Sequence, residues 1–272
     1  MQEHFAEWQD DLPQVSGWPA FFDDCDNLDF QVIPEILQIE DVTFVWPGRR
    51  ENPLPNAPDG VHICRAFEGI EPADARVVVL GQDPYRSVTE ATGRAFEDGS
   101  WRGERTEELA RSCPRKGEHL TPHAALTTSN GRADLFRPGS WLEIRRQIRD
   151  RDLVLPALNN YFNALAGQGV LFVNTAWTRT GDDHLRCGSR LWKPVVDCML
   201  RKLARSNQHV VFLILGGDAR EALCAADPIC HCSAIVDSAH PVGYASHHPA
   251  GEKSARRSVA RQRQAHLRKG VR

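Results

Sequence analysis

Short apolar runs recur along the chain at intervals that suit alternating strands and helices. Four of these runs have the length and apolar content of buried strands, and they cover residues 77–80, 170–173, 210–215 and 234–236. A helical period of apolar positions covers residues 192–204 after Ser189, and shorter helices are predicted at residues 140–149 and 157–165. We therefore expect an α/β fold with three layers, α/β/α, around a central, mostly parallel four-stranded sheet.

The least regular part of the chain lies between the first and second predicted strands. Residues 98–137 are polar and interrupted by glycine and proline, which predicts an insertion with one helix near residues 104–111. No internal repeat marks a second unit, so residues 1–272 are predicted to form a single domain. Residues 252–272 form a basic C-terminal tail.

Composition limits the classes of protein to which the chain can belong. Its 272 residues are 41% hydrophobic, which is enough for a sizeable core. No apolar run approaches the roughly 18 residues of a membrane helix. The N-terminus, from Met1 to His4, lacks the features of a signal peptide. We expect a soluble cytoplasmic protein, or a nuclear one if its source has a nucleus, with no membrane association.

The eight cysteines are scattered, and a reducing compartment disfavours disulfides among them. Their one cluster comprises Cys224, Cys230, His231 and Cys232, and its spacing matches no zinc or iron–sulfur pattern. We therefore expect structural or surface thiols without disulfide bonds, and no metal site.

Charge is distributed unevenly along the chain, although the formal net charge is only −3. Residues 1–40 carry ten acidic side chains and no Lys or Arg, whereas residues 252–272 carry eight basic side chains and one acid, Glu252. The basic tail can attract nucleic acid phosphates, or it can be a solvated helix with a frayed end. The low net charge argues against DNA binding driven by charge alone, so any contact with DNA is expected to be local.

Polar residues follow the predicted strands where each strand ends. Asp83 comes shortly after the first strand and Asn174 ends the second, while Gly216 and Gly217 follow the third and His240 comes after the fourth. In a parallel sheet these ends share one edge, and open α/β sheets bind ligands at such an edge. A carboxylate, an amide and an imidazole would then converge. Each residue by itself also fits an ordinary turn or packing position.

Several motifs occur together in one order. Residues 81–85 read Gly-Gln-Asp-Pro-Tyr, residues 168–175 read Gln-Gly-Val-Leu-Phe-Val-Asn-Thr, and residues 238–241 read Ser-Ala-His-Pro. Phe96 follows the first motif and Trp192 follows the second, each at the spacing seen in the family named next. This set resembles the uracil-DNA glycosylases that are built around a GQDPY motif, and the resemblance covers nearly the whole chain. It implies a DNA repair enzyme that flips uracil out of DNA and hydrolyses its N-glycosidic bond, leaving an abasic site for base excision repair.

The resemblance implies catalytic roles for two side chains. Asp83 would orient the attacking water and stabilise the positive charge that develops on the sugar. His240 would donate a hydrogen bond to uracil O2 as the departing base gains negative charge. Gln82 would contribute its backbone N–H to the same oxygen. No lysine occupies a matching nucleophile position, so the resemblance implies a monofunctional glycosylase, and no cofactor is expected.

Uracil recognition is implied in the same way. Phe96 would stack on the flipped base. The Asn174 carboxamide would donate to O4 and accept from N3–H, which suits uracil. Tyr85 would exclude thymine by occupying the space near C5.

The resemblance is weaker where the family holds DNA. Arg86 replaces a histidine, Gly217 replaces a phosphate-contacting serine, and Tyr244 stands where a leucine would enter the duplex. The residues implied in DNA binding are Arg86, Ser140, Gly216, Gly217, Pro241 and Tyr244. We expect the chemistry to be kept and the grip on the duplex to be reorganised, through the insertion or the basic tail. The altered loop puts binding of the family's phage-encoded DNA-mimic inhibitor in question.

The expected partners are uracil-containing DNA, single- or double-stranded, and free uracil as the product, with the protein acting as a monomer. Three alternatives are considered. One is a glycosylase of the same superfamily for another target, such as xanthine, hypoxanthine or a G·T mismatch. Another is a catalytically silent protein that binds uracil in DNA. The third is a covalent uracil trap, which would need a nucleophile near residue 244, and the spacing of His247 and His248 from His240 gives it no strong case. Tyr85 and Asn174 favour uracil, and Asp83 and His240 count against a silent protein.

Overall fold

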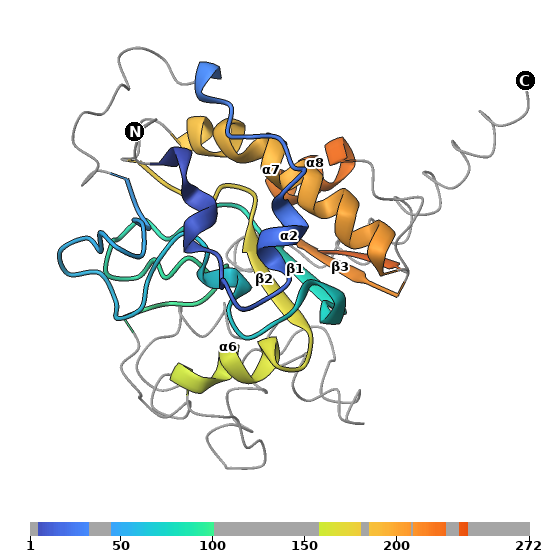
Figure 1. Ribbon diagram of the computed structural model, residues 1–272, viewed down its shortest axis with the longest axis horizontal. Helices are drawn as coiled ribbons and strands as arrows, with labels where there is room; N and C mark the ends of the chain where they lie inside the picture. Colours follow the sequence, from blue (N-terminus) through green and yellow to red (C-terminus); the bar gives the residue numbers. More distant parts are fainter. Residues whose placement is uncertain are drawn as a thin grey trace, which may run out of the picture.

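A parallel sheet with helices on both faces forms the centre of the molecule (Figure 1). The computed structural model describes residues 5–32, 45–100, 158–180, 185–207, 209–226 and 234–238. The strands are β1 (Val77–Gly81), β2 (Val170–Asn174), β3 (Val211–Leu215) and β4 (Ala234–Ser238). The α-helices are α2 (Trp18–Phe22), α6 (Leu158–Ala166), α7 (Leu185–Ser206) and α8 (Gly217–Ala226). Short 3₁₀ helices are η1 (Trp8–Asp11), η2 (Phe30–Val32), η5 (Arg65–Phe67) and η6 (Pro72–Asp74).

The strands pair in the order β2-β1-β3-β4, and every neighbouring pair is parallel. The predicted four-stranded sheet is therefore confirmed, because continuous apolar runs are typical of strands that are buried on both faces. β1 lies inside the sheet, between β2 and β3. The loop that follows β1 thus leaves the middle of the carboxyl edge, where neighbouring strands can bring side chains to it.

The two faces of the sheet bury different helices. Val78 and Leu80 of β1 belong to one core cluster, together with side chains of α7 and α8. Val79 points to the opposite face, where Tyr161 and Phe162 of α6 lie in a second cluster. Alternate side chains of a strand point to opposite faces, so these two clusters define the outer layers of an α/β/α arrangement. The predicted three layers are present.

Helix α7 is longer than the sequence predicts. The apolar period indicates residues 192–204, whereas the helix begins at Leu185 and contains Pro194 in its interior. Proline cannot donate the helical hydrogen bond and commonly occupies a first turn, which favours a later start. Buried Leu191 and Trp192 anchor the helix on the core from just before this proline. Residues 185–190 carry no comparable apolar stripe, so periodicity alone could not predict them.

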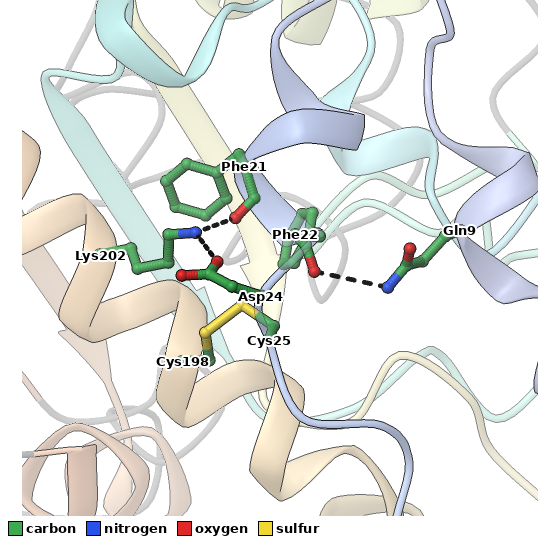
Figure 2. Close-up of a disulfide and its surroundings, with 7 residues drawn as sticks. All are labelled: Gln9, Phe21, Phe22, Asp24, Cys25, Cys198 and Lys202. Atoms are coloured by element: carbon green, nitrogen blue, oxygen red, sulfur yellow. Dashed lines mark hydrogen bonds and ion pairs between the residues drawn. A yellow bond between two sulfur atoms is a disulfide. The ribbon is translucent and has the colours of Figure 1, made fainter.

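The acidic N-terminal segment, residues 5–32, packs with α7 in the core cluster on one face of the sheet, and its helix α2 lies near the centre of the view in Figure 1. The Trp8 ring meets the Trp192 ring edge to face, with centroids 5.7 Å apart. The Asp24 carboxylate pairs with the Lys202 ammonium on α7 (Figure 2). Part of the acidity of this segment therefore has a role in the fold.

A disulfide joins Cys25 of this segment to Cys198 of α7 (Figure 2). The expectation of thiols without disulfide bonds was wrong for these two cysteines. They are 173 residues apart in sequence, and the fold brings their Cα atoms to 5.8 Å, a separation that suits a disulfide. Sequence spacing carries no sign of such a distant pair. Cys64 is a buried free thiol and Cys224 an exposed one.

Several predictions fall outside the described residues. They are the helices at 104–111 and 140–149, the insertion beyond residue 100, and the basic tail 252–272. The single-domain organisation stays a prediction. Within the described ranges, no helix is long and apolar enough to cross a membrane. The same ranges contain no group of three His, Cys, Asp or Glu side chains that could hold a metal ion.

Candidate active site

The chain segments that follow β1 and β2 stay joined beyond the sheet. Gly81 pairs with Asn174, and the Gly81 carbonyl accepts a hydrogen bond from the Thr175 N–H at 3.0 Å. The Gln82 carbonyl accepts one from the Ala176 N–H at 3.0 Å and one from the Thr175 hydroxyl at 2.7 Å. A trans peptide places its N–H opposite its carbonyl, so the Gln82 N–H points away from β2. The predicted Gln82 donor therefore sits on a fixed backbone.

Gly81 brings the side chain of Asn174 close to the end of β1. A Cβ at position 81 would lie 2.4 Å from Asn174 Oδ1, 3.1 Å from the Ala95 Cβ and 3.3 Å from the Phe96 ring. Packing therefore requires glycine here, because no side chain fits within such distances. The missing side chain allows a buried amide and a buried aromatic ring to meet at one point.

Phe96 sits on a strained backbone in this contact. Its φ of 66° lies in the left-handed region, which aromatic residues rarely adopt, and such strain is often found at functional sites. The Ala95 N–H donates to the Phe172 carbonyl of β2 at 3.4 Å, and the Tyr85 hydroxyl donates to the Phe96 carbonyl at 3.3 Å. Burial raises the pKa of Tyr85 far above its usual value, with the Asp98 carboxylate adding to the effect. Tyr85 is therefore a neutral donor that holds the phenylalanine in place.

A buried arginine faces Asp83. The Arg179 guanidinium pairs with the Asp83 carboxylate, and their side chains are 5% and 17% exposed. Burial raises the pKa of Asp83, and Asp218 of α8 acts in the same direction. The charges of Arg179 and Arg86 oppose this rise. The net pKa is raised, so the ionisation of this carboxylate depends on a balance among its neighbours.

Trp46 ties the two sides of this ion pair together. Its backbone N–H donates to the Arg179 carbonyl at 2.9 Å, and the Arg179 N–H donates back to the Trp46 carbonyl at 2.7 Å. The indole Nε1–H donates to the Tyr85 carbonyl at 2.8 Å, on the loop that carries Asp83. Arg179 and Trp46 were not predicted from the sequence. A single arginine shortly after a buried strand was the one available signal, and it does not reveal its partner.

A second buried arginine supports the loop that presents Phe96. Arg94 donates to the carbonyls of Arg65 at 3.1 Å and Glu68 at 3.0 Å, and to the Asn163 side chain of α6 at 2.7 Å. The loop is thereby fixed both to η5 and to the helix below the sheet. Phe96 is therefore presented by a rigid segment, which suits a stacking surface.

A cavity of about 570 Å³ opens at this edge of the sheet, within the size range of small-ligand sites. Its lining includes six of the eight predicted residues that lie on the described part of this edge, namely Gln82, Asp83, Tyr85, Arg86, Phe96 and Asn174. Arg179 lines it as well. Gly216 and Gly217 lie after β3, at the start of α8, and are not among the lining residues. The predicted residues Ser140, His240, Pro241 and Tyr244 lie outside the described ranges.

A sequence comparison agrees with this geometry. The family "Uracil DNA glycosylase superfamily" matches residues 68–265, and the chain belongs to this superfamily. Among curated relatives, the uracil-DNA glycosylase of Lactiplantibacillus plantarum is 25% identical over 184 residues, which are 68% of this chain and 65% of the relative. That of Porphyromonas gingivalis is 28% identical over 204 residues, which are 75% of this chain and 76% of the relative. The chain thus spans less than two thirds of the length of the first of these relatives.

Solved structures show the same fold. The wild-type UNG crystal structure from Nitratifractor salsuginis superposes with a TM-score of 0.51 at 22% sequence identity. The superposition covers 66% of this chain and 70% of that chain. The likeness concerns the arrangement of the sheet and helices.

Proposed function

We propose that the protein hydrolyses the N-glycosidic bond of uracil in DNA, releasing free uracil and leaving an abasic site. One observation carries the proposal. The Asn174 amide, the Phe96 ring and the Asp83 carboxylate come from three separate segments and line one cavity at the carboxyl edge of the sheet. Membership of the superfamily and the names of the relatives support the same activity.

The chemistry assigns one step to each group. DNA presents the flipped uracil to the cavity, where Phe96 stacks on its face and Asn174 pairs with O4 and N3–H. The bond between sugar C1′ and uracil N1 then breaks, leaving positive charge on the sugar and negative charge on the base. The Asp83 carboxylate stabilises the sugar cation and orients the water that adds to C1′. The added water loses one proton, and the uracil anion takes up one proton to leave as neutral uracil. His240 donates a hydrogen bond to O2 of the departing base.

An oligonucleotide that contains a single uracil tests the proposal directly. Pure protein followed by alkali should cut the strand at the uracil, because alkali cleaves abasic sites. The assay uses single- and double-stranded substrates, since the strand preference is open. Absence of scission on both would overturn the proposal.

Two variants test the assigned catalytic roles in that assay. Asp83→Asn and His240→Ala should each lower the single-turnover rate about 100-fold or more, because each removes a fixed group aimed at developing charge. Circular dichroism shows whether each variant is folded. Activity near that of the wild type in a folded variant would remove that residue from its role.

The alternatives give different results in the same experiment. A panel of oligonucleotides with xanthine, hypoxanthine or a G·T mismatch identifies a glycosylase for another base. Tight binding of uracil-containing DNA without an abasic product identifies a silent binding protein. Tyr85 is among the lining residues, and the resemblance assigns it the exclusion of a methyl group at C5, which favours uracil over thymine.

We propose that the residues that contact the DNA backbone differ from those used elsewhere in the family. Arg86 is exposed and lies on the cavity lining, where its charge can meet a phosphate. Gly217 is exposed at the first turn of α8, and a Cβ there would meet nothing within 4 Å. The space for a side chain is therefore present, although the phosphate-contacting serine is not. Ser140, Gly216, Pro241 and Tyr244 complete the proposed contact set.

A further inference from the structure

Arg179 reaches the predicted catalytic carboxylate from a neighbouring segment. The residue lies five positions after Asn174, and its guanidinium pairs with Asp83 and also donates to the Pro84 carbonyl at 3.5 Å. Because its side chain is only 5% exposed, solvent screens this pair far less than a surface pair.

The backbone of Arg179 is fixed by hydrogen bonds to a distant segment of the chain. Two hydrogen bonds to Trp46, one in each direction, form an isolated antiparallel bridge. The Trp46 indole also donates to the Tyr85 carbonyl, two residues after Asp83. Trp46 is thus hydrogen-bonded both to the backbone of Arg179 and to the loop that carries Asp83. These bonds fix the distance between the two backbone segments that carry the charged side chains.

Three charged groups act on Asp83, and each comes from a different element. Arg179 lies after β2, Arg86 on the same loop as Asp83, and Asp218 in the first turn of α8. Arg86 and Asp218 are exposed, whereas Arg179 is buried. Burial and Asp218 raise the pKa of Asp83, and Arg179 is the first of the groups that lower it. Arg179 is therefore the principal group that opposes protonation of this carboxylate.

We infer that Arg179 is a positioning residue for the reaction, whose charge keeps the Asp83 carboxylate ionised and in one orientation toward the cavity. The inference rests on the proposed function, because it assigns Arg179 an effect on the reaction through Asp83. Only an ionised Asp83 can stabilise the sugar cation. The rate must therefore fall as the pH falls through the pKa of Asp83. The midpoint of this fall, the acid limb of the pH–rate profile, therefore reports the effect of Arg179 on Asp83. The maximal rate is a poorer measure, because the positive charge of Arg179 also offsets the negative charge with which Asp83 stabilises the sugar cation.

The test compares pH profiles of single-turnover uracil release at constant ionic strength. Arg179→Met removes the charge and keeps much of the length, so the midpoint of its acid limb should rise by about 1–3 pH units. Arg179→Lys keeps the charge and should remain close to the wild type. Asp218→Asn removes a carboxylate that raises the pKa of Asp83, so the midpoint of the acid limb should be lower in this variant than in the wild type. An unchanged midpoint in folded Arg179→Met, or equal shifts in the Met and Lys variants, would overturn the inference.

A measurement without substrate separates this inference from the proposed function. Carboxyl ¹³C NMR follows the titration of Asp83, and Asp83→Asn identifies its signal. The titration midpoint should be higher in Arg179→Met and lower in Asp218→Asn than in the wild type. If the wild-type protein does not cut uracil-containing DNA, the proposed function is contradicted. If the NMR titration midpoints are the same in the wild type and the variants, the inference about Arg179 is contradicted. If Arg179→Met does not fold, Arg179→Lys still tests the inference, because a midpoint in folded Arg179→Lys well above that of the wild type would overturn it.

Discussion

Gly81 shows how a single absent side chain decides the geometry of the site. Its backbone continues β1, pairs with Asn174 and leaves room for the Asn174 amide and the Phe96 ring. A larger residue would have to displace one of these groups, since both are buried and neither can move freely into solvent. At the scale of the residue, the proposed recognition of uracil therefore depends on the absence of a Cβ as much as on the side chains that surround it.

Gly81→Ala should lower kcat/KM for uracil-DNA on the order of 100-fold, because displacement of the reading amide by about 1 Å can cost this much. Steady-state cleavage of a uracil oligonucleotide measures the effect. Gly167→Ala is a matched control, since the nearest atom to its new Cβ would lie 3.6 Å away, an ordinary contact, in the turn before β2. Equal activity of the two variants would contradict the role assigned to the contact between Gly81 and Asn174.

At the scale of the element, a charged cluster fixes the loops next to the cavity. Glu68 follows η5, and one of its oxygens accepts from His62 Nε2 and from Arg50 Nη2, each at 2.9 Å. Burial alone would raise the pKa of Glu68, but the bond to His62 and the nearby Arg65 lower it to about 2, from an ordinary value of 4.5. The same residue's carbonyl accepts from Arg94, which supports the Phe96 loop. The charged cluster around Glu68 is thus connected through Arg94 to the loop that presents Phe96 to the cavity.

The lowered pKa of Glu68 predicts how its contribution to stability depends on pH. A carboxyl whose folded pKa is depressed stabilises the fold fully above its unfolded value, near 4.5, and loses this contribution as the pH falls toward about 2. Glu68→Gln should therefore lower the free energy of unfolding at pH 7 and differ less from the wild type at pH 3. Urea unfolding at both pH values measures it. A difference that is the same at both pH values would contradict the prediction.

The sequence predicts the elements better than the contacts between their ends. β1 and β2 could be predicted because their apolar runs are uninterrupted, and their parallel pairing places Asp83 and Asn174 at one edge. The pair between Asp83 and Arg179 could not be predicted. It depends on how the chain turns after β2 and on the bridge from Trp46, which belongs to a third segment. No local propensity encodes contacts of this kind, because they are settled only when the segments pack.

At the scale of the whole molecule, the N-terminal segment is attached to α7 by three kinds of contact. The Cys25–Cys198 disulfide is covalent, the Asp24–Lys202 pair is ionic, and Trp8 packs among aromatic rings of the core. The disulfide closes a loop of most of the chain, and long loops gain most in the chain-entropy account of such bonds. The segment is therefore held against α7 on one face of the sheet.

Replacing both Cys25 and Cys198 by serine should lower the free energy of unfolding by about 2–5 kcal/mol under oxidising conditions. Thermal unfolding with and without dithiothreitol measures the effect. The reductant should lower the Tm of the wild type and leave that of the double variant unchanged. Cys224→Ser, which changes an exposed free thiol, should behave like the wild type in both buffers. A wild-type Tm that is insensitive to reduction would contradict the prediction.

The position of the N-terminal segment has a consequence for synthesis of the protein on the ribosome. Residues 5–32, with Trp8, Trp18 and Phe22 among them, emerge well before Trp177 and Trp192, which pack against Trp8. During that interval the segment must carry large aromatic side chains without its core partners, a state that favours aggregation. The first forty residues carry ten acids and no Lys or Arg, so mutual repulsion can keep nascent chains apart. Asp24, which pairs with Lys202 of α7 in the folded protein, belongs to this acidic group and would then help to protect the chain before α7 is made.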